Sequence, residues 1–191
     1  LNEDTFFEIG NAIASKWNQL SIDSIVLGRD GRLSGEPLMN ALKNSLLSNG
    51  ISVENIGIVT SPLLYYAAKK HSSKSGIMVT GSHNPKEYNG IKMIINDEPV
   101  SGKEIFELIG TPNNASSKGT FTVNEDVINN YIEEVKSKSI QSKYEIKVVI
   151  DCGNGAAGVI APKLFKALGF NVVEIFSEVD GNFPNHHPDP G

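Results

Sequence analysis

Hydrophobic residues recur along this chain with two different periods, one typical of helices and one typical of short strands. Residues 3–18 place apolar side chains three and four positions apart, which predicts a helix with one packing face. Those side chains are Phe6, Ile9, Ile13 and Trp17. Apolar runs rich in β-branched residues at 25–27 and 53–58 predict strands, and a helical leucine pattern separates them. Strands that alternate with helices are typical of an α/β fold.

A polar loop between two further apolar runs interrupts this alternation. Residues 77–79 and 91–95 are short, rich in β-branched residues and bounded by Gly or Asn, so both runs predict strands. Residues 81–90 between them contain Gly, Asn and Pro, which favour positive φ angles, a fixed φ and local hydrogen bonds. We therefore expect a rigid loop that joins two strands.

A helix is expected between residue 60 and residue 70. Thr60 is predicted to be its N-cap because Ser61 and Pro62 follow in the first turn. His71 falls at the C-terminus of this helix, where we expect a solvated cap.

Changes in composition divide the chain into two units. A connector rich in Ser, Asn and Gly lies at 111–119, and residues 120–123 predict a short edge strand. A charged helix from residue 127 links the units. Its charged side chains are interpreted as a solvated face, namely Glu133, Glu134, Lys136 and Lys138. We expect a layered α/β/α domain with a mixed sheet over residues 1–124, followed by this linker helix and an incomplete second α/β domain over 125–191.

The composition excludes several classes of function. The chain has 191 residues, 39% of them hydrophobic, and its net charge of -5 argues against a nucleic-acid surface. No apolar run approaches the roughly 20 residues of a membrane span, and the N-terminus lacks the positive charge of a signal peptide. The single cysteine, Cys152, is expected to be a small buried residue in a reducing compartment. We expect a cytoplasmic protein in which local cations bind any anionic substrate.

The loop at 81–90 places groups suited to phosphoryl transfer close together. The stretch from residue 76 to 96 is GIMVTGSHNPKEYNGIKMIIN, with the hydroxyl of Ser82 in the loop and the cation of Lys92 just beyond it. Phosphoryl transfer depends mainly on positioning and on stabilisation of charge. An ordinary capped turn is the alternative interpretation of Ser-His-Asn-Pro. The flanking residues are not a Gly-x-Ser-x-Gly elbow, which argues against a serine hydrolase.

The segment TGSHNP followed by YNGIK resembles the phosphoserine loop of the α-D-phosphohexomutases, most closely that of bacterial phosphomannomutase/phosphoglucomutase enzymes. The resemblance implies that hexose 1-phosphate and hexose 6-phosphate are interconverted through a bisphosphosugar. It implies that Ser82 carries the phosphoryl group and, through that phosphate, helps to bind Mg²⁺. Lys92 would neutralise charge or move a proton and would also contact the substrate. His83 would contact the phosphate or brace the loop, and Asn84 would bind the substrate.

The resemblance covers nearly the whole chain and implies that it is an N-terminal fragment of a four-domain enzyme. In the family, a strand and an Arg-bearing loop precede the first helix, and we expect both to lie outside this chain. The carboxylate metal loop, the sugar-selecting residues and the C-terminal phosphate-binding loop are also expected elsewhere. The fragment is therefore expected to be inactive alone, and its preferred hexose and oligomeric state stay open.

The segment GRDGRLSG at 28–35 admits two interpretations. It joins a strand to the N-terminus of a helix, a junction that can bind anions through free amides and guanidinium groups. Alternatively, Arg29, Asp30 and Arg32 form a structural hydrogen-bond network, which is the interpretation we favour.

A glycine-rich segment in the second unit gives the alternative function. Gly153, Gly155 and Gly158 follow a predicted buried strand at 146–150, match the dinucleotide-binding fingerprint and precede a helix that is expected to end near residue 169. We favour a packing role, because Glu174 lies inside the next predicted strand instead of ending it.

The last twelve residues contain three potential metal ligands, His186, His187 and Asp189. Adjacent histidines point in different directions in an extended chain, and three prolines predict irregular structure. We interpret this segment as a loop near the domain junction rather than as a metal site.

Overall fold

The first unit is a mixed sheet with helices on both faces. The structure is a computed structural model that describes residues 1–107, 117–140 and 144–188. The elements of this unit are α1 (Glu3–Gln19), β1 (Ser24–Arg29), α2 (Gly35–Ser48), β2 (Ser52–Ile58), α3 (Ser61–Lys70), β3 (Gly76–Val79), β4 (Ile91–Ile95), β5 (Glu98–Val100), α4 (Gly102–Glu107) and β6 (Phe121–Val123). The sheet order is β5-β4-β3-β1-β2-β6, in which β4 runs antiparallel to both of its neighbours, β3 and β5, and the other pairs are parallel. The expected α/β fold with a mixed sheet is confirmed.

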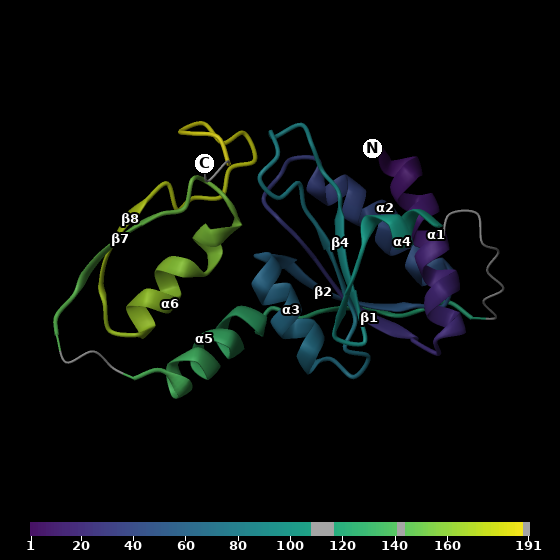
Figure 1. The fold of residues 1–191 in the computed structure, drawn as a ribbon, viewed down its shortest axis with the longest axis horizontal. Coiled ribbons are helices and arrows are strands. Elements are labelled where there is room, and N and C mark those ends of the chain that lie inside the picture. Colours follow the sequence, from purple (N-terminus) through teal and green to yellow (C-terminus); the bar gives the residue numbers. More distant parts are fainter. Residues whose placement is uncertain (108–116, 141–143, 189–191) are drawn as a thin grey trace.

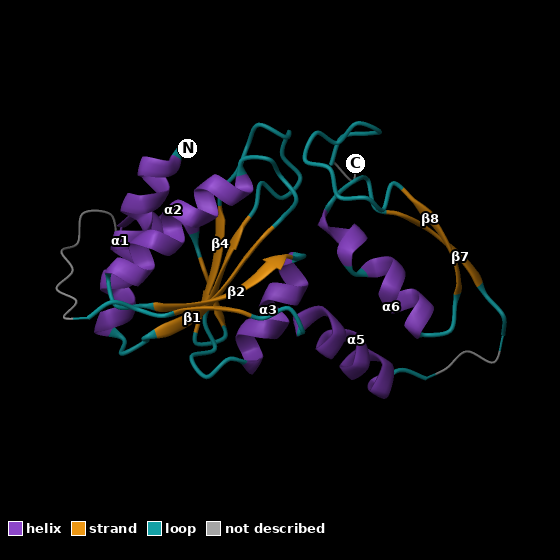
Figure 2. Ribbon diagram, turned by 180° about the vertical axis from the view of Figure 1, so that it is seen from behind, coloured by secondary structure: helices purple, strands orange, loops and turns teal. Residues whose placement is uncertain are grey.

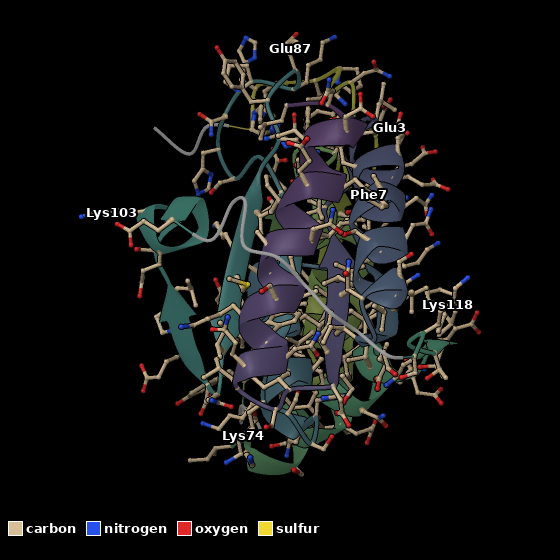
Figure 3. All side chains as sticks on the ribbon, turned by 90° about the vertical axis from the view of Figure 1, so that its right-hand side faces the viewer. Glu3, Phe7, Lys74, Glu87, Lys103 and Lys118 are labelled. Carbon is tan, nitrogen blue, oxygen red and sulfur yellow. The ribbon has the colours of Figure 1, made fainter. Side chains whose placement is uncertain are left out.

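Helices α1 and α2 lie together on one face of the sheet, as Figure 2 shows from behind. Phe6, Ile13 and Trp17 of α1 are completely buried against strand residues such as Ile25 and Leu27. Full burial of one such side chain contributes roughly 1.5–3 kcal/mol, so the helical period seen in the sequence marks the face that stabilises this layer. Figure 3 views the molecule from the α1 side, with Glu87 at one end and Lys74 at the opposite end.

Helix α3 covers the other face of the sheet. The residues at its two ends, Thr60 and His71, differ in detail from what the sequence predicted. Thr60 is the N-cap in extended backbone, but its side chain makes no capping hydrogen bond. His71 is the C-cap, yet its side chain is only 14% exposed, so it is not a solvated cap. Its Nδ1 lies 2.9 Å from the hydroxyl of Ser73 in the turn that leads to β3, which accounts for its burial.

The second unit is smaller and follows the linker helix. Its elements, with that helix, are α5 (Val127–Lys138), β7 (Lys147–Asp151), the 3₁₀ helix η1 (Ala156–Val159), α6 (Ala161–Ala167) and β8 (Asn171–Ile175). Strands β7 and β8 pair in parallel, α6 packs beside them, and α5 lies between α6 and α3 in Figure 1. No described helix is long and apolar enough to cross a membrane.

The strand predicted at 146–150 is not buried, contrary to the expectation. Ile146 is 40% exposed and Val149 is 58% exposed, whereas Val148 and Ile150 are half-buried. Helix α6 packs on this two-stranded sheet, and alternate side chains of a strand point to opposite faces. Within the described residues, the face that carries Val149 is left uncovered.

Of the four charged residues predicted to form a solvated face, Glu133, Lys136 and Lys138 are exposed, but Glu134 is half-buried, so the prediction is wrong for Glu134. Its carboxylate accepts a hydrogen bond from the Tyr66 hydroxyl at 3.0 Å and pairs with Lys70 of α3 at 2.9 Å and Lys138 at 2.5 Å. The hydrogen bonds from Lys138, Lys70 and Tyr66 lower the pKa of Glu134 to about 2. Glu134 therefore attaches α5 to α3.

The glycine-rich turn after β7 is shaped by packing, and the helix after it is interrupted. A Cβ on Gly158 would lie 2.0 Å from the carbonyl oxygen of Ser177, so only glycine fits there without movement. The 3₁₀ turn η1 precedes α6, and Pro162, which lacks an N–H, lies in the first turn of α6. A dinucleotide-binding loop instead leads directly into the N-terminus of a long helix. The dinucleotide alternative is therefore not favoured.

Candidate functional site

A pocket lies where the loops of the two units meet. In Figure 1 the teal loop between β3 and β4 is beside the yellow segment that follows β8. The pocket has a volume of about 670 Å³, and residues at the carboxyl ends of β1, β2, β3 and β7 contribute to its walls. Among the lining side chains are Ser82, His83 and Lys92 from the first unit and Asp151 and His186 from the second. Ligands of α/β proteins commonly bind at the carboxyl ends of strands.

Ser82 and Lys92 are brought together by the β3–β4 hairpin. Ser82 follows the end of β3, and the antiparallel register that pairs Met78 with Lys92 returns the lysine to the same edge of the sheet. Lys92 Nζ donates a hydrogen bond to Ser82 Oγ at 3.2 Å. A hydroxyl and a cation thus face one another in the pocket, which is the juxtaposition that the sequence led us to expect.

The backbone around Ser82 is held in an unusual conformation. Ser82 has a φ of 54°, in the left-handed region that residues other than glycine rarely adopt. Its backbone N–H donates to the hydroxyl of Thr80 at 2.9 Å, and that hydroxyl donates to Asp30 Oδ2 at 2.7 Å. The backbone N–H of Gly81 donates to the same carboxylate oxygen at 3.2 Å. Asp30 therefore anchors the start of the loop.

The other two predicted site residues in the loop lie in different settings. His83 is exposed, lines the pocket, and its Nδ1 is 3.3 Å from the carbonyl oxygen of Pro188 in the second unit. Asn84 is not among the residues that line the pocket, and its side-chain amide donates to the carbonyl of Gly81 at 2.9 Å. Asn84 therefore braces the loop through this contact, a role that the sequence analysis did not assign to it, and its predicted contact with substrate stays a prediction.

The arginines of the segment 28–35 belong to hydrogen-bond networks, as we favoured. Arg32 is 1% exposed and donates to Asp30 and to carbonyl groups of the Ser82 loop. Arg29 donates to the carbonyl of Asp30 at 3.0 Å and pairs with Glu36 at 3.4 Å. These contacts direct both guanidinium groups toward oxygen atoms of the protein itself, not toward an anion in the pocket.

The wall opposite Ser82 holds an ion pair between His186 and Asp151. His186 Nε2 lies 3.1 Å from Asp151 Oδ1, and His186 Nδ1 lies 3.0 Å from the carbonyl oxygen of His187. The hydrogen bond to His187 and then that to Asp151 raise the pKa of His186. The backbone N–H of Gly153, and then His186, lower the pKa of Asp151. Since both ring nitrogens face oxygen acceptors, these contacts favour the protonated imidazolium.

Comparison with known proteins decides the family of this site. The model of phosphoglucomutase/phosphomannomutase α/β/α domain I matches residues 1–117, and the model of α/β/α domain II matches residues 129–191. The chain belongs to the phosphoglucomutase/phosphomannomutase family. The resemblance inferred from the Ser82 loop is therefore confirmed.

Individual members of the family agree with this assignment. The chain is 46% identical to a phosphomannomutase/phosphoglucomutase of Pseudomonas syringae and 45% identical to a phosphoglucomutase of Neisseria gonorrhoeae. All of this chain is covered in both, but only 41% and 42% of those proteins. The crystal structure of a phosphoglucomutase/phosphomannomutase family protein from Burkholderia thailandensis matches with a TM-score of 0.91 and 39% identity, over 100% of this chain and 43% of that one.

Within the described residues of this phosphoglucomutase/phosphomannomutase chain, no three His, Cys, Asp or Glu side chains gather into a set that could hold a metal ion. His186 makes the contacts described above, and Asp189 lies outside the described residues. Cys152 is buried as expected and accepts a hydrogen bond from the Ser177 hydroxyl at 3.6 Å.

Sequence reasoning missed the roles of Asp30 and Thr80 at the site. The two residues are 50 positions apart, and their hydrogen bond exists only because β1 and β3 are neighbours in the sheet. The available signal was that Thr80 directly follows the strand predicted at 77–79 and Asp30 comes shortly after the strand predicted at 25–27, since the ends of neighbouring parallel strands lie at one edge of a sheet.

Proposed function

We propose that the full-length protein containing this chain interconverts hexose 1-phosphate and hexose 6-phosphate through a phosphoserine at Ser82. The observation that supports this most directly is the 3.2 Å contact between Lys92 Nζ and Ser82 Oγ in the pocket of a phosphoglucomutase/phosphomannomutase fold. The chain spans less than half the length of its curated relatives, so the complete cleft needs more than these residues. We retain the proposed division into domains near residue 124, between the two matched regions.

The proposed reaction has two transfers that mirror one another. A sugar hydroxyl oxygen attacks the phosphorus of phospho-Ser82, the bond between phosphorus and Ser82 Oγ breaks, and the sugar hydroxyl loses its proton. The product is a bisphosphosugar. Ser82 Oγ then attacks the other phosphate of that sugar, which restores the phosphoserine and releases the isomeric monophosphate.

Lys92 and the loop supply charge and position for both transfers. The ammonium group at Ser82 Oγ stabilises negative charge as the oxygen leaves phosphorus, or delivers the proton that this oxygen takes up. His83, which is exposed at the pocket, is placed to contact the phosphate, and Asn84 holds the loop in shape. In this proposal the acidic chain meets an anionic substrate through local cations at the site.

We also propose Mg²⁺ as the cofactor of the full-length protein. Mg²⁺ prefers oxygen ligands, and phosphate oxygens on Ser82 are the ligands that this chain would contribute. Because the described residues group no set of carboxylates, the remaining ligands would come from other parts of the full-length protein. When bound, the ion would offset the charge of the serine phosphate.

The test replaces Ser82 by alanine in the full-length protein. Ser82→Ala removes the atom that carries the phosphoryl group, so turnover of glucose 1-phosphate and mannose 1-phosphate should fall almost to zero. Ser72→Ala is the matched control, because this exposed serine precedes β3 and so lies at the opposite end of that strand. Intact mass and phosphosite mapping should find phosphate on Ser82 only in proteins that keep this serine.

A folded Ser82→Ala protein with wild-type turnover would refute the proposed function. Circular dichroism establishes that both variants are folded. We expect no loss of stability in either variant, because a half-buried loop hydroxyl contributes little to the core.

A further inference from the structure

We propose that Arg32 is a positioning residue for Ser82: its buried guanidinium, together with Asp30 and Thr80, holds both peptide groups of Ser82 and so keeps its hydroxyl at Lys92. The kinetic part of this inference rests on the proposed function. Its structural part does not, because it concerns the conformation of the loop whether or not Ser82 accepts a phosphoryl group.

The guanidinium of Arg32 uses every donor that it has. An arginine side chain offers five N–H groups. The Nε–H donates to Asp30 Oδ2 at 3.2 Å, and the other four donate to carbonyl oxygens of a single loop. These bonds go from Nη2 to Ser82 at 2.9 Å and Asn84 at 2.7 Å, and from Nη1 to Pro85 at 2.5 Å and Tyr88 at 3.1 Å.

The position of Arg32 excludes a role as an anion-binding residue. Its residue surface is 1% exposed although its atoms contribute to the pocket wall. An incoming phosphate would have to displace loop carbonyls from donors that are already occupied. A buried charge that is fully hydrogen-bonded within the protein is a structural group rather than a free ligand site.

Ser82 is restrained on both sides of its unusual φ angle. The N–H of Ser82 donates to the hydroxyl oxygen of Thr80, and the Thr80 hydroxyl donates in turn to Asp30. The carbonyl oxygen of Ser82 accepts a hydrogen bond from Arg32. Asp30 also bonds Arg32 directly, so one cation and one carboxylate determine both peptide planes. Non-glycine residues keep a positive φ only where surrounding structure determines it, and such residues cluster at functional sites.

The guanidinium is packed on two sides. A Cβ on Gly81 would lie 2.5 Å from Arg32 Cζ and equally close to the carbonyl oxygen of Tyr88, so the loop backbone contacts the guanidinium directly. Phe183 of the second unit places its ring 5.4 Å from Arg32 Cζ. A lysine has three donors at one point and cannot reproduce four carbonyl contacts spread over residues 82–88.

The experiment compares Arg32→Lys with Arg29→Lys in the full-length protein. Arg29 is three residues away and bonds Asp30 and Glu36 instead of the loop, so it is a matched control for charge and substitution type. Arg32→Lys should lower kcat by about a hundredfold, the loss that a misplacement of about 1 Å can cause, with little change in KM. In Arg32→Lys, the rate at which phosphate is transferred from a hexose bisphosphate to Ser82 should fall together with kcat.

Hydrogen–deuterium exchange gives a readout that does not depend on turnover. In Arg32→Lys, peptides that cover residues 81–90 should exchange faster, while peptides from α1 and α2 should exchange as in the wild type. In Arg29→Lys, the loop peptides should be unchanged. The exchange measurement tests whether Arg32 holds the loop in place. It does so even if Ser82→Ala proves active and the proposed function is wrong.

Two results would overturn the inference. One is an increased KM with unchanged kcat in Arg32→Lys, which would make Arg32 a substrate-binding group. The other is wild-type exchange in the loop together with wild-type kcat. Should Arg32→Lys not fold, Thr80→Val removes the hydroxyl between Asp30 and the Ser82 amide: a loss of kcat supports the restraint, and wild-type kcat contradicts it.

Discussion

The residues at the pocket form two groups: those proposed to take part in the reaction, and those that keep the reacting residues in position. Ser82 and Lys92 lie with Oγ and Nζ 3.2 Å apart, whereas Asp30, Thr80 and Arg32 contact the backbone on either side of Ser82. Both groups line the pocket, but Thr80 and Arg32 are buried, whereas Ser82 and Lys92 are half-buried. Removal of a reacting group should therefore change the rate of chemistry without changing the fold.

Lys92→Ala tests the reacting group in the full-length protein. We expect kcat to fall by about 10² to 10⁴, the range for one general acid or one preorganised electrostatic group. Lys86→Ala is the control, since this exposed lysine lies in the same loop but does not line the pocket. Steady-state kinetics of both variants, with phosphosite mapping, give the answer. A wild-type kcat in Lys92→Ala would remove Lys92 from the mechanism and leave the role of Ser82 untouched.

Helices α3 and α5 are attached to one another by both apolar and charged contacts. Tyr66 and Tyr131 pack edge to face with ring centroids 5.0 Å apart, and Glu134 accepts from Tyr66 beside them. Lys70 and Lys138 complete the charged part of this contact. The linker helix is thus held on the first unit, which helps to place the second unit at the pocket.

The lowered pKa of Glu134 predicts a pH dependence of this contact. The folded pKa is about 2 against an ordinary 4.5, so the contribution of Glu134 to stability is present above about pH 4.5 and is lost as the pH falls toward 2. The wild-type chain should therefore lose more stability between pH 5 and pH 3 than Glu134→Gln. Glu133→Gln, at an exposed neighbour, should behave as the wild type. Urea denaturation at several pH values measures this, and identical pH profiles for wild type and Glu134→Gln would contradict it.

At the scale of the whole molecule, the pocket has walls from two units. Ser82, His83 and Lys92 come from the first unit, and Asp151 and His186 from the second. The chain nevertheless covers only 41–43% of the similar proteins described above. Val149 of β7 and Val173 of β8 are exposed on the same face of this two-stranded sheet, and the expectation of an incomplete second domain stays a prediction.

The chain of residues 1–191 alone is therefore expected to show no steady mutase turnover. Glucose 1-phosphate or mannose 1-phosphate would be supplied with Mg²⁺ and a bisphosphosugar, and product would be followed by a coupled assay. The physical reason is that the described residues hold no set of metal ligands and form only part of the proposed cleft. Turnover by purified protein free of host enzymes would contradict this expectation, while full-length protein serves as the positive control.

The sequence by itself determined the features that depend on neighbouring residues. The apolar face of α1, the strands on either side of the Ser82 loop and the mixed α/β character follow from local periods, and the structure confirms them. The pairing of Ser82 with Lys92 was also accessible, because a short hairpin returns a residue ten positions later to the same edge.

Only the tertiary structure decided which distant groups meet. Arg32 contacts loop residues 50 to 56 positions away, Glu134 bonds Tyr66 of another helix, and Val149 is exposed where a buried strand was predicted. The local pattern is the same for a solvated and a paired carboxylate, and for a covered and an uncovered strand. The difference arises from what packs against each of them, and that is set by the order of strands in the sheet and the helices on its faces, not by the neighbouring sequence.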